Sequence, residues 1–322
     1  METGGPGDRA VVRVIVPRYK LIVAYDGTAF CGWQKQEPFA PTGANKSELS
    51  EWYTHAETVD DRPDRVALRT VQHVLERAVR EVVREPIILM GASRTDSGVH
   101  ARGQVAAFTC RGDEEAAAGE ARGIGWPASR GTDRLMAAIN GRLPDDVLVV
   151  AAHEAAPGFD PISDVESKGY SYTLHTSRER PLFDRHFVHH VRSALDMAAM
   201  DEAAKHLIGE HDFASFAATG HGRLTTVRRV LECRVIRTGP ERIRVDVSGT
   251  GFLWNMVRIL AGTLVHVGLG RLTPGEIVEI LAARNRARAG PTLPPTGLCL
   301  EWVRYRPEAA LASRPENSEP SL

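Results

Sequence analysis

Cysteine is scarce in this chain of 322 residues. The four cysteines stand singly at positions 31, 110, 233 and 299, and no CxxC pair occurs. Disulfide frameworks and structural zinc sites need cysteines in closely spaced or repeated sets, so neither is indicated. We therefore predict no metal site and a reducing, cytoplasmic location.

Long apolar runs are also missing. A membrane-spanning helix needs roughly 20 consecutive apolar residues, and no run in the chain approaches that length. Near the start, acidic residues lie close to Met1, and a short apolar stretch is interrupted by Arg13 and Pro17, which is unlike a signal peptide. We predict no membrane association.

Neither sign of charge dominates the composition. The chain has 40 Lys and Arg residues against 41 Asp and Glu residues, which gives a formal net charge of −1. A large excess of positive charge would indicate a polyanionic partner, and this balance gives no such indication. Any surface that binds a nucleic acid must therefore come from local clustering of basic residues.

The remaining composition is typical of a soluble globular protein. Hydrophobic residues make up 43% of the chain and charged residues 25%, and the length allows one large domain or two moderate ones. Neither GxGxxG after a strand nor GxxxxGK(S/T) occurs, so a dehydrogenase or another nucleotide-dependent enzyme has no support.

Alternation and helical spacing predict strands and helices in both halves. Thr70 is a typical N-cap, and the apolar residues after it recur at helical spacing as far as Val82, which predicts an amphipathic helix. Further helices are predicted at about 132–143, at 195–208 with an end at Gly209, and at 253–270. Strands are predicted at about 19–25, 87–93, 104–110, 146–155 and 169–176, and a hairpin at 225–239 and 241–252.

Polar, turn-rich stretches predict how the chain is divided. We expect an N-terminal extension at 1–17, an N-terminal half at 18–157, a C-terminal half at 158–306 and a disordered tail at 307–322. Stretches at about 37–68 and 111–131 are predicted to be inserted surface loops, the first with a short helix at 47–53.

Residues 91–104, GASRTDSGVHARGQ, are the segment most indicative of chemistry. Arg94, His100 and Arg102 surround a single acid, Asp96, in a loop rich in Gly and Ser between two predicted strands. A carboxylate beside guanidinium groups is favoured in its ionised form, which suits a nucleophile or a base. An Arg–Asp pair that only pins a turn explains the same spacing equally well.

The order of several motifs resembles the TruA family of tRNA pseudouridine synthases. These motifs are YDGTAFCGWQ (25–34), RTDSGVHA (94–101), AINGRLPDDVLV (138–149), SKGYSYTL (167–174), LIGEHDFASF (207–216), GTGFLWNMVRILAGTL (249–264) and PPTGLCLEWV (294–303). Together they extend over about residues 19–305. A resemblance spread along most of the chain is more specific than one short motif.

The resemblance implies a fold, a reaction and a partner. The implied fold is mixed α/β (α+β), with two similar halves, each a mostly antiparallel sheet backed by helices, and a central RNA-binding cleft. In the implied reaction Asp96 attacks a uridine at the ribose or the ring, the bond to N1 breaks, and the uracil rejoins through C5 without any cofactor. The implied target is uridine at positions 38, 39 and 40 of the tRNA anticodon arm, modified by a homodimer.

The resemblance also assigns catalytic roles residue by residue. Tyr170 matches the tyrosine that stacks on the target base and assists deprotonation at C5, and Arg258 matches the arginine placed against Asp96. Arg94 resembles an arginine that occupies the place of the extruded base. The residues alone explain Tyr170 equally well as a core tyrosine, like Tyr172 on the same strand face, and Arg258 as a surface arginine.

Several basic and polar residues are predicted to bind the substrate. The set comprises Lys35, Arg94, Thr95, His100, Arg102, Arg223, Arg228 and Arg229. Backbone phosphates are the expected targets of the cations. A solvated surface charge is the alternative for each cation taken singly.

The chain departs from the family pattern in two respects. About thirty residues separate Gln36 from Arg69, where the family usually has a few, and a second excess lies at about 111–131. These insertions are predicted either to add RNA contacts or to cover part of a dimer surface. After Phe159 the family commonly shows F-x-x-R, but Ile162 stands where that arginine is expected. The usual choice of tRNA positions is therefore left open.

Two other functions remain in view. One is a pseudouridine synthase that acts on another tRNA position or another RNA, and the other is a non-catalytic RNA-binding or chaperone module on the same fold. The joint presence of Asp96, Tyr170 and Arg258 favours an enzyme, because binding alone does not require them as a set.

Overall fold

A single large sheet extends through the computed structural model, which describes residues 16–40, 57–59, 62–112, 123–218 and 224–306. Its strand order is β6 (Val147–Ala155), β1 (Arg18–Tyr25), β5 (His100–Thr109), β12 (Leu298–Tyr305), β7 (Val165–Thr176), β11 (Arg242–Gly249), β10 (Val227–Gly239) and β9 (Gly209–Asp212). Two short strands lie off this path: β4 (Met90–Gly91) pairs with β5, and β8 (His189–Val191) pairs with β7. Among the described strands, pairing is antiparallel except between β12 and β5 and between β7 and β8.

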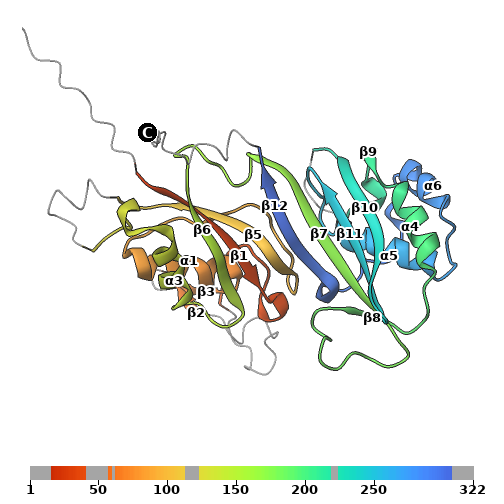
Figure 1. The fold of residues 1–322 in the computed structure, drawn as a ribbon, viewed down its shortest axis with the longest axis horizontal. Helices are drawn as coiled ribbons and strands as arrows, with labels where there is room; N and C mark the ends of the chain where they lie inside the picture. The colour runs from red at the N-terminus through yellow and green to blue at the C-terminus, as the bar shows by residue number, and fades with distance from the viewer. Residues whose placement is uncertain (1–15, 41–56, 60–61, 113–122, 219–223, 307–322) are drawn as a thin grey trace, which may run out of the picture.

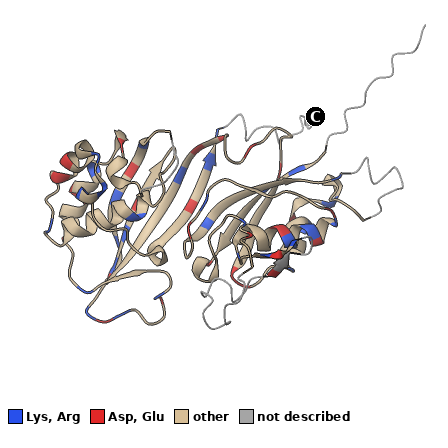
Figure 2. Cartoon of the chain, turned by 180° about the vertical axis from the view of Figure 1, so that it is seen from behind, with Lys and Arg blue, Asp and Glu red and all other residues tan. Residues whose placement is uncertain are grey.

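Helices back both ends of this sheet (Figure 1). The described α-helices are α1 (Val71–Val83), α3 (Thr132–Asn140), α4 (Met197–Lys205), α5 (Met256–Gly268) and α6 (Glu276–Ala283). The first two pack together, α3 also contacts β6, and α4 contacts both β10 and α5. Lys and Arg are interspersed with Asp and Glu over both ends of the molecule (Figure 2). The helices packed on a mostly antiparallel sheet confirm the mixed α/β fold predicted from the sequence.

The amphipathic helix predicted after Thr70 is confirmed as α1. The Thr70 hydroxyl accepts a hydrogen bond from the backbone N–H of His73 at 3.3 Å, and Arg84 ends the helix in the left-handed conformation. Val71, Leu75 and Val79 are fully buried on one face. This burial fixes α1 against the sheet.

Two predicted elements have different bounds in the structure. The helix predicted to run to Gly209 ends at Lys205, because Gly209 has φ 116° and begins β9, whose backbone pairs with β10. The strand predicted at 87–93 is reduced to Met90–Gly91, although Ile87 and Leu89 remain buried. In both cases sheet pairing, which local periodicity does not show, sets the boundary.

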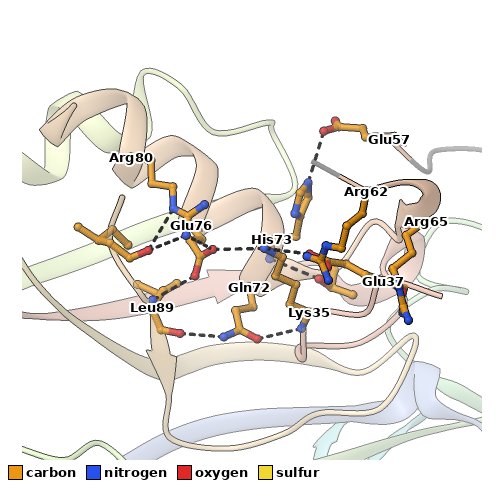
Figure 3. Close-up of polar contacts among 12 residues, drawn as sticks. Lys35, Glu37, Glu57, Arg62, Arg65, Gln72, His73, Glu76, Arg80 and Leu89 are labelled. Atoms are coloured by element: carbon orange, nitrogen blue, oxygen red, sulfur yellow. Dashed lines mark hydrogen bonds and ion pairs between the residues drawn. The ribbon is translucent and has the colours of Figure 1, made fainter. Parts of the chain in front are cut away.

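The predicted inserted loop at 37–68 contains a β-hairpin. Strands β2 (Glu57–Val59) and β3 (Arg62–Ala67) pair in the described part, so the loop prediction is wrong there, and the predicted helix at 47–53 lies outside the described residues. Figure 3 shows the ion pairs and hydrogen bonds around this hairpin and α1. Glu57, for example, pairs with Arg77 of α1 at 2.5 Å. Cross-strand pairing and contact with α1 explain why a polar stretch becomes regular structure.

The second predicted surface loop, at 111–131, is in part buried. Trp126 is 3% exposed, and its indole N–H donates to the carbonyl of Gly131 at 3.2 Å. The expectation of a surface excursion is wrong at this residue, and residues 113–122 lie outside the described part of the chain.

The two expected halves share one sheet. Strand β12, near the end of the described chain, lies between β5 and β7, parallel to β5 through the pairs Cys299–His100 and Leu300–Ala101. The same strand is antiparallel to β7. The last strand therefore joins the N-terminal strands to the C-terminal ones, in place of two separate sheets.

Candidate active site

Asp96 lies in the loop at residues 92–99 between β4 and β5, and the β1–α1 connection earlier in the chain supports this loop. The backbone N–H of Trp33 donates to the carbonyl of Thr95 at 3.1 Å. The Ser97 hydroxyl donates to the carbonyl of Phe30 at 3.0 Å. These bonds join the GWQ and RTDSG motifs, which are about 60 residues apart in sequence.

A buried hydrogen bond holds the loop from the sheet side. The hydroxyls of Tyr25, at the end of β1, and Thr95 lie 2.8 Å apart. Both side chains are buried, and burial raises the pKa of Tyr25 above its ordinary value, so its phenol stays protonated at neutral pH. Thr95, predicted to bind substrate, therefore lines the pocket wall while its hydroxyl is engaged by the core.

The Asp96 carboxylate accepts hydrogen bonds from two donors at the start of α5. Its Oδ1 lies 3.1 Å from the indole Nε1 of Trp254, and its Oδ2 lies 3.3 Å from Nη1 of Arg258. Arg258 is itself held, because Nε donates to the carbonyl of Leu293 at 2.7 Å and Nη1 donates to Oδ1 of Asn255 at 2.7 Å. Both carboxylate oxygens are thus oriented, and one of them faces a fixed cation.

Tyr170 comes from β7 and lies in the same pocket. Its hydroxyl is 2.9 Å from Oγ of Ser93, and its ring packs edge-on against Phe252 with centroids 5.2 Å apart. Burial, with a smaller contribution from the charge of Asp96, raises the pKa of Tyr170 to about 12. The phenol is therefore protonated at neutral pH. Tyr172, by contrast, is fully buried and donates to the carbonyl of Pro294.

A pocket of about 970 Å³ connects these groups. Arg94 and Lys168 supply cations to its lining, Gln34 and Gln72 supply amides, and Trp254 and Phe252 supply aromatic surface. The volume is at the upper end of the usual range for small-ligand sites, roughly 300 to 1,000 Å³. A flipped nucleotide needs both polar contacts and an aromatic face, and this lining offers both.

The comparisons with known proteins agree with this geometry. A protein-family model described as tRNA pseudouridine synthase matches residues 203–306. The tRNA pseudouridine synthase A of Geobacter sulfurreducens is 42% identical over 286 residues, which are 89% of this chain and 98% of that protein. The chain belongs to the tRNA pseudouridine synthase A family. Proteins of the same name are 38% identical in Moorella thermoacetica, over 90% of this chain and all of that protein, and 37% identical in Geotalea daltonii, over 89% and 98%.

In this member of the tRNA pseudouridine synthase A family, part of the predicted site lies in one pocket. Asp96, Tyr170, Arg258, Arg94 and Thr95 all line it. Arg94 is exposed, as a residue that meets a ligand from solvent must be. The catalytic roles of these residues stay predictions, and the geometry is compatible with them.

His100 does not line this pocket, although it was predicted to bind the substrate. Its side chain is buried at the start of β5, where Nδ1 accepts from the backbone N–H of Gly27 at 3.0 Å and Nε2 lies 2.8 Å from the carbonyl of His186. A neutral ring protonated at Nε2 satisfies both bonds. His100 therefore connects segments of the chain behind the Asp96 loop.

Arg102 and Lys35 are both engaged by carboxylates. Arg102 pairs with Glu301 at 3.1 Å and lines a separate hollow of about 300 Å³. Lys35 lies 3.1 Å from Glu37 and 3.6 Å from Glu76, a buried residue of α1 (Figure 3). Neither cation lines the pocket that holds Asp96.

Two described arginines of the basic run near residue 225, Arg228 and Arg229, are also outside the pocket. Arg228 and Arg229 lie on β10, where Arg228 donates to the carbonyls of Thr225 and Val227. Arg223 lies outside the described residues. The predicted substrate-binding set is therefore spread over several surfaces.

Trp254, Ser93 and Asn255 are pocket residues that sequence reasoning missed. Each touches one of the predicted catalytic residues, through the bonds to Asp96, Tyr170 and Arg258 described above. Trp254 and Asn255 stand within the quoted GTGFLWN motif, and Ser93 directly precedes RTDSG. Their position in these motifs was a usable signal. The partners of Trp254 and Ser93 are distant in sequence, whereas Asn255 contacts Arg258 within one motif.

Proposed function

We propose that this protein isomerises uridine to pseudouridine in tRNA, with Asp96 as the carboxylate that begins the reaction. The observation that carries the proposal is the fixed environment of Asp96, with Arg258 on one oxygen and Trp254 on the other at the wall of a pocket lined by Tyr170. Membership in the tRNA pseudouridine synthase A family supports it. A nucleophile held between two donors does not need to reorganise before it attacks.

The reaction balances without any co-reactant. Asp96 forms a bond to the ribose or the ring, the bond between C1′ and N1 breaks, and the uracil turns. A bond between C1′ and C5 then forms, the bond to Asp96 breaks and regenerates the carboxylate, C5 loses a proton and N1 gains one. Because Tyr170 is protonated at neutral pH, it accepts the C5 proton only as it passes its own to a neighbour. Ser93, 2.9 Å away, is placed to relay it: Ser93 takes up the phenol proton as its own hydroxyl proton passes to water, and N1 takes up a proton from water.

The proposed substrate site is uridine 38, 39 or 40 of the anticodon arm. Besides Arg258, which pairs with Asp96, the cations Arg94 and Lys168 line the pocket and would meet the phosphates beside the target nucleotide. Ile162, which replaces the arginine expected there, also lines the pocket and is 58% exposed. The contact that this arginine supplies in the family is therefore replaced by apolar surface, and the modified positions need a direct test.

A homodimer in the cytoplasm completes the proposal. The family resemblance supports the dimer, and the singly placed cysteines support a reducing compartment. In the part of the chain that is described, no helix is both long and apolar enough to cross a membrane.

The test is release of tritium from tRNA labelled at C5 of uridine, followed by mapping of the modified positions. We expect release, with pseudouridine at positions 38 to 40. Release with modification only elsewhere would contradict the proposed positions but keep the chemistry. No release from any tRNA would contradict the proposed function.

A further inference from the structure

We propose that the β7–β8 loop, residues 177–188, is a second RNA-binding site, in which Arg180 and Arg185 bind backbone phosphate and Phe183 stacks on an unpaired base. The proposal rests on the proposed function insofar as tRNA is the substrate. Figure 1 shows this loop, in green, extending beyond the lower end of β7, and Figure 2 shows basic segments along it. It was not among the surfaces predicted from the sequence.

The loop carries cations that lack acidic partners. Arg178, Arg180 and Arg185 are exposed, and no carboxylate of the described residues lies within ion-pairing distance of them. The loop also holds two acids: Asp184 pairs instead with Arg242 of β11, and Glu179 forms no ion pair with a described residue. Lys35 and Arg102, in contrast, are neutralised by carboxylates. Charge left unpaired in a chain of net charge −1 is the local clustering that a polyanion requires.

Two of these arginines line a hollow suited to an anion. Its volume is about 420 Å³, and its lining includes Arg180, Arg185, His189 and Thr296 but no acidic residue. Nη1 of Arg185 donates to the carbonyl of Leu182 at 2.8 Å, which orients the guanidinium within the loop. A phosphate entering the hollow would meet two guanidinium groups and no opposing charge.

The same loop exposes an aromatic side chain. Phe183 is 90% exposed and the adjacent Leu182 is 59% exposed. A ring left in water next to unpaired guanidinium groups matches the platforms on which proteins stack unpaired bases. A second copy of this chain is a less suitable occupant, because a two-fold axis through the loop would bring like-charged arginines together.

The loop is connected to the segment that carries Asp96. Nε2 of His100, four residues after Asp96, lies 2.8 Å from the carbonyl of His186 in the loop. Thr296, in the wall of the hollow, follows Pro295, and a side chain added at Gly98 would meet Pro295 at 2.9 Å. A strand bound in the hollow is therefore held against the structure that fixes the Asp96 loop.

The test is tRNA binding by the full chain in the Asp96→Asn background, which separates binding from turnover. The variants are the double change Arg180→Gln with Arg185→Gln, the single change Phe183→Ala, and the control Arg134→Gln. Arg134 is an exposed arginine of α3 that lines neither the hollow nor the Asp96 pocket. The dissociation constant is measured at several salt concentrations, with the oligomeric state checked by sedimentation.

We expect the double variant to bind more weakly and to lower the slope of log K against log salt by about 1 to 2, because each phosphate contact contributes roughly 0.7 to 0.9. Phe183→Ala is expected to weaken binding roughly tenfold with an unchanged slope.

Binding by the double variant that equals the Arg134→Gln control would overturn the proposal. So would weaker binding that accompanies loss of a dimer, which would assign the loop to self-association. Tight tRNA binding by a wild type that releases no tritium would refute the proposed function alone.

Discussion

At the scale of single residues, the carboxylate of Asp96 depends on side chains from the turn that begins α5. Trp254 precedes the helix, and Arg258 belongs to its first turn. Two hydrogen-bond donors from the N-terminal end of one helix therefore meet the same carboxylate. The sequence motifs identified Asp96 and Arg258, but the contribution of Trp254 follows only from the three-dimensional contact.

Trp254→Phe tests this contact. The substitution keeps an aromatic ring but removes the N–H that donates to Oδ1 of Asp96. A hydrogen bond to a charged group contributes about 1.5 to 3 kcal/mol, so we expect kcat to fall roughly 10- to 150-fold. The measurement is single-turnover tritium release, with the thermal midpoint as the control. Because Trp254 is 50% exposed, the midpoint should change little, and an unchanged kcat would exclude the contact from catalysis.

His100 was predicted to bind the substrate, but its contacts with Gly27 and His186 indicate that it supports the structure behind the Asp96 loop. Burial lowers its pKa below the ordinary value of 6.5, against the opposing charge of Asp26. The unfolded chain therefore takes up a proton at a higher pH than the folded protein does. The stability contributed by neutral His100 is complete above about pH 6.5 and falls as the pH drops toward the lowered pKa.

We expect His100→Asn to reduce this pH dependence. The asparagine carbonyl oxygen replaces Nδ1 as the acceptor for Gly27, but the side chain does not titrate. The measurement is the free energy of unfolding in urea at pH 8.0 and 5.5 for both proteins. His153, His189 and His266 also have lowered pKa values, so a shallower dependence remains in the variant. Identical pH dependence in the two proteins would contradict the assignment.

At the scale of elements, the position of the Asp96 loop depends on the β1–α1 connection that is hydrogen-bonded to it. Gly32 in that connection has φ 88°, and a Cβ added there would lie 2.7 Å from the carbonyl oxygen of Thr95. Glycine is required at this position both by backbone conformation and by the close approach of the loop. The GWQ motif therefore acts on the site through packing and backbone hydrogen bonds.

Gly32→Ala is expected to lower the free energy of unfolding by about 1 to 3 kcal/mol and to reduce kcat by moving Thr95 and Asp96. Gly131→Ala is the matched control, because Gly131 has φ 79° but a Cβ there would meet nothing within 4 Å. The two variants are compared by urea unfolding and tritium release. If both lose the same stability and neither loses activity, the proposed support of the Asp96 loop is wrong.

Local sequence patterns predicted the elements whose determinants are local. Helix α1 has its own cap at Thr70, and the hairpin of β10 and β11 has clear alternation on both strands. The end of α4 and the hairpin of β2 and β3 were not predicted, because pairing with β10 and contacts with α1 decide them. Those partners lie far away in sequence or on another element.

At the scale of the whole molecule, strand β12 joins the two ends of the sheet. It pairs with β5 through only two residue pairs but with β7 along most of its length. The family resemblance indicated two similar halves. The continuous sheet depends on strand pairing between positions about 200 residues apart, such as Cys299 and His100. Periodicity carries no information about such a pairing.

The assembled site depends on this arrangement. Asp96 comes from the loop between β4 and β5, and Tyr170 and Arg258 come from β7 and α5 on the other side of β12. The motifs identified these three residues, but not Ser93 and Asn255, which orient two of them. The contact of Ser93 with Tyr170 depends on the joined sheet, whereas Asn255 orients Arg258 within a single motif.

The central claim is that Asp96 performs the chemistry and is not needed to bind tRNA. The most direct measurement compares wild type with Asp96→Asn in release of tritium from tRNA labelled at C5 and in the dissociation constant for the same tRNA. We expect release to be abolished while the dissociation constant changes little, because the remaining contacts reach shape and phosphates. Retained release, or an equal loss of binding and turnover, would contradict the claim and make Asp96 a structural residue.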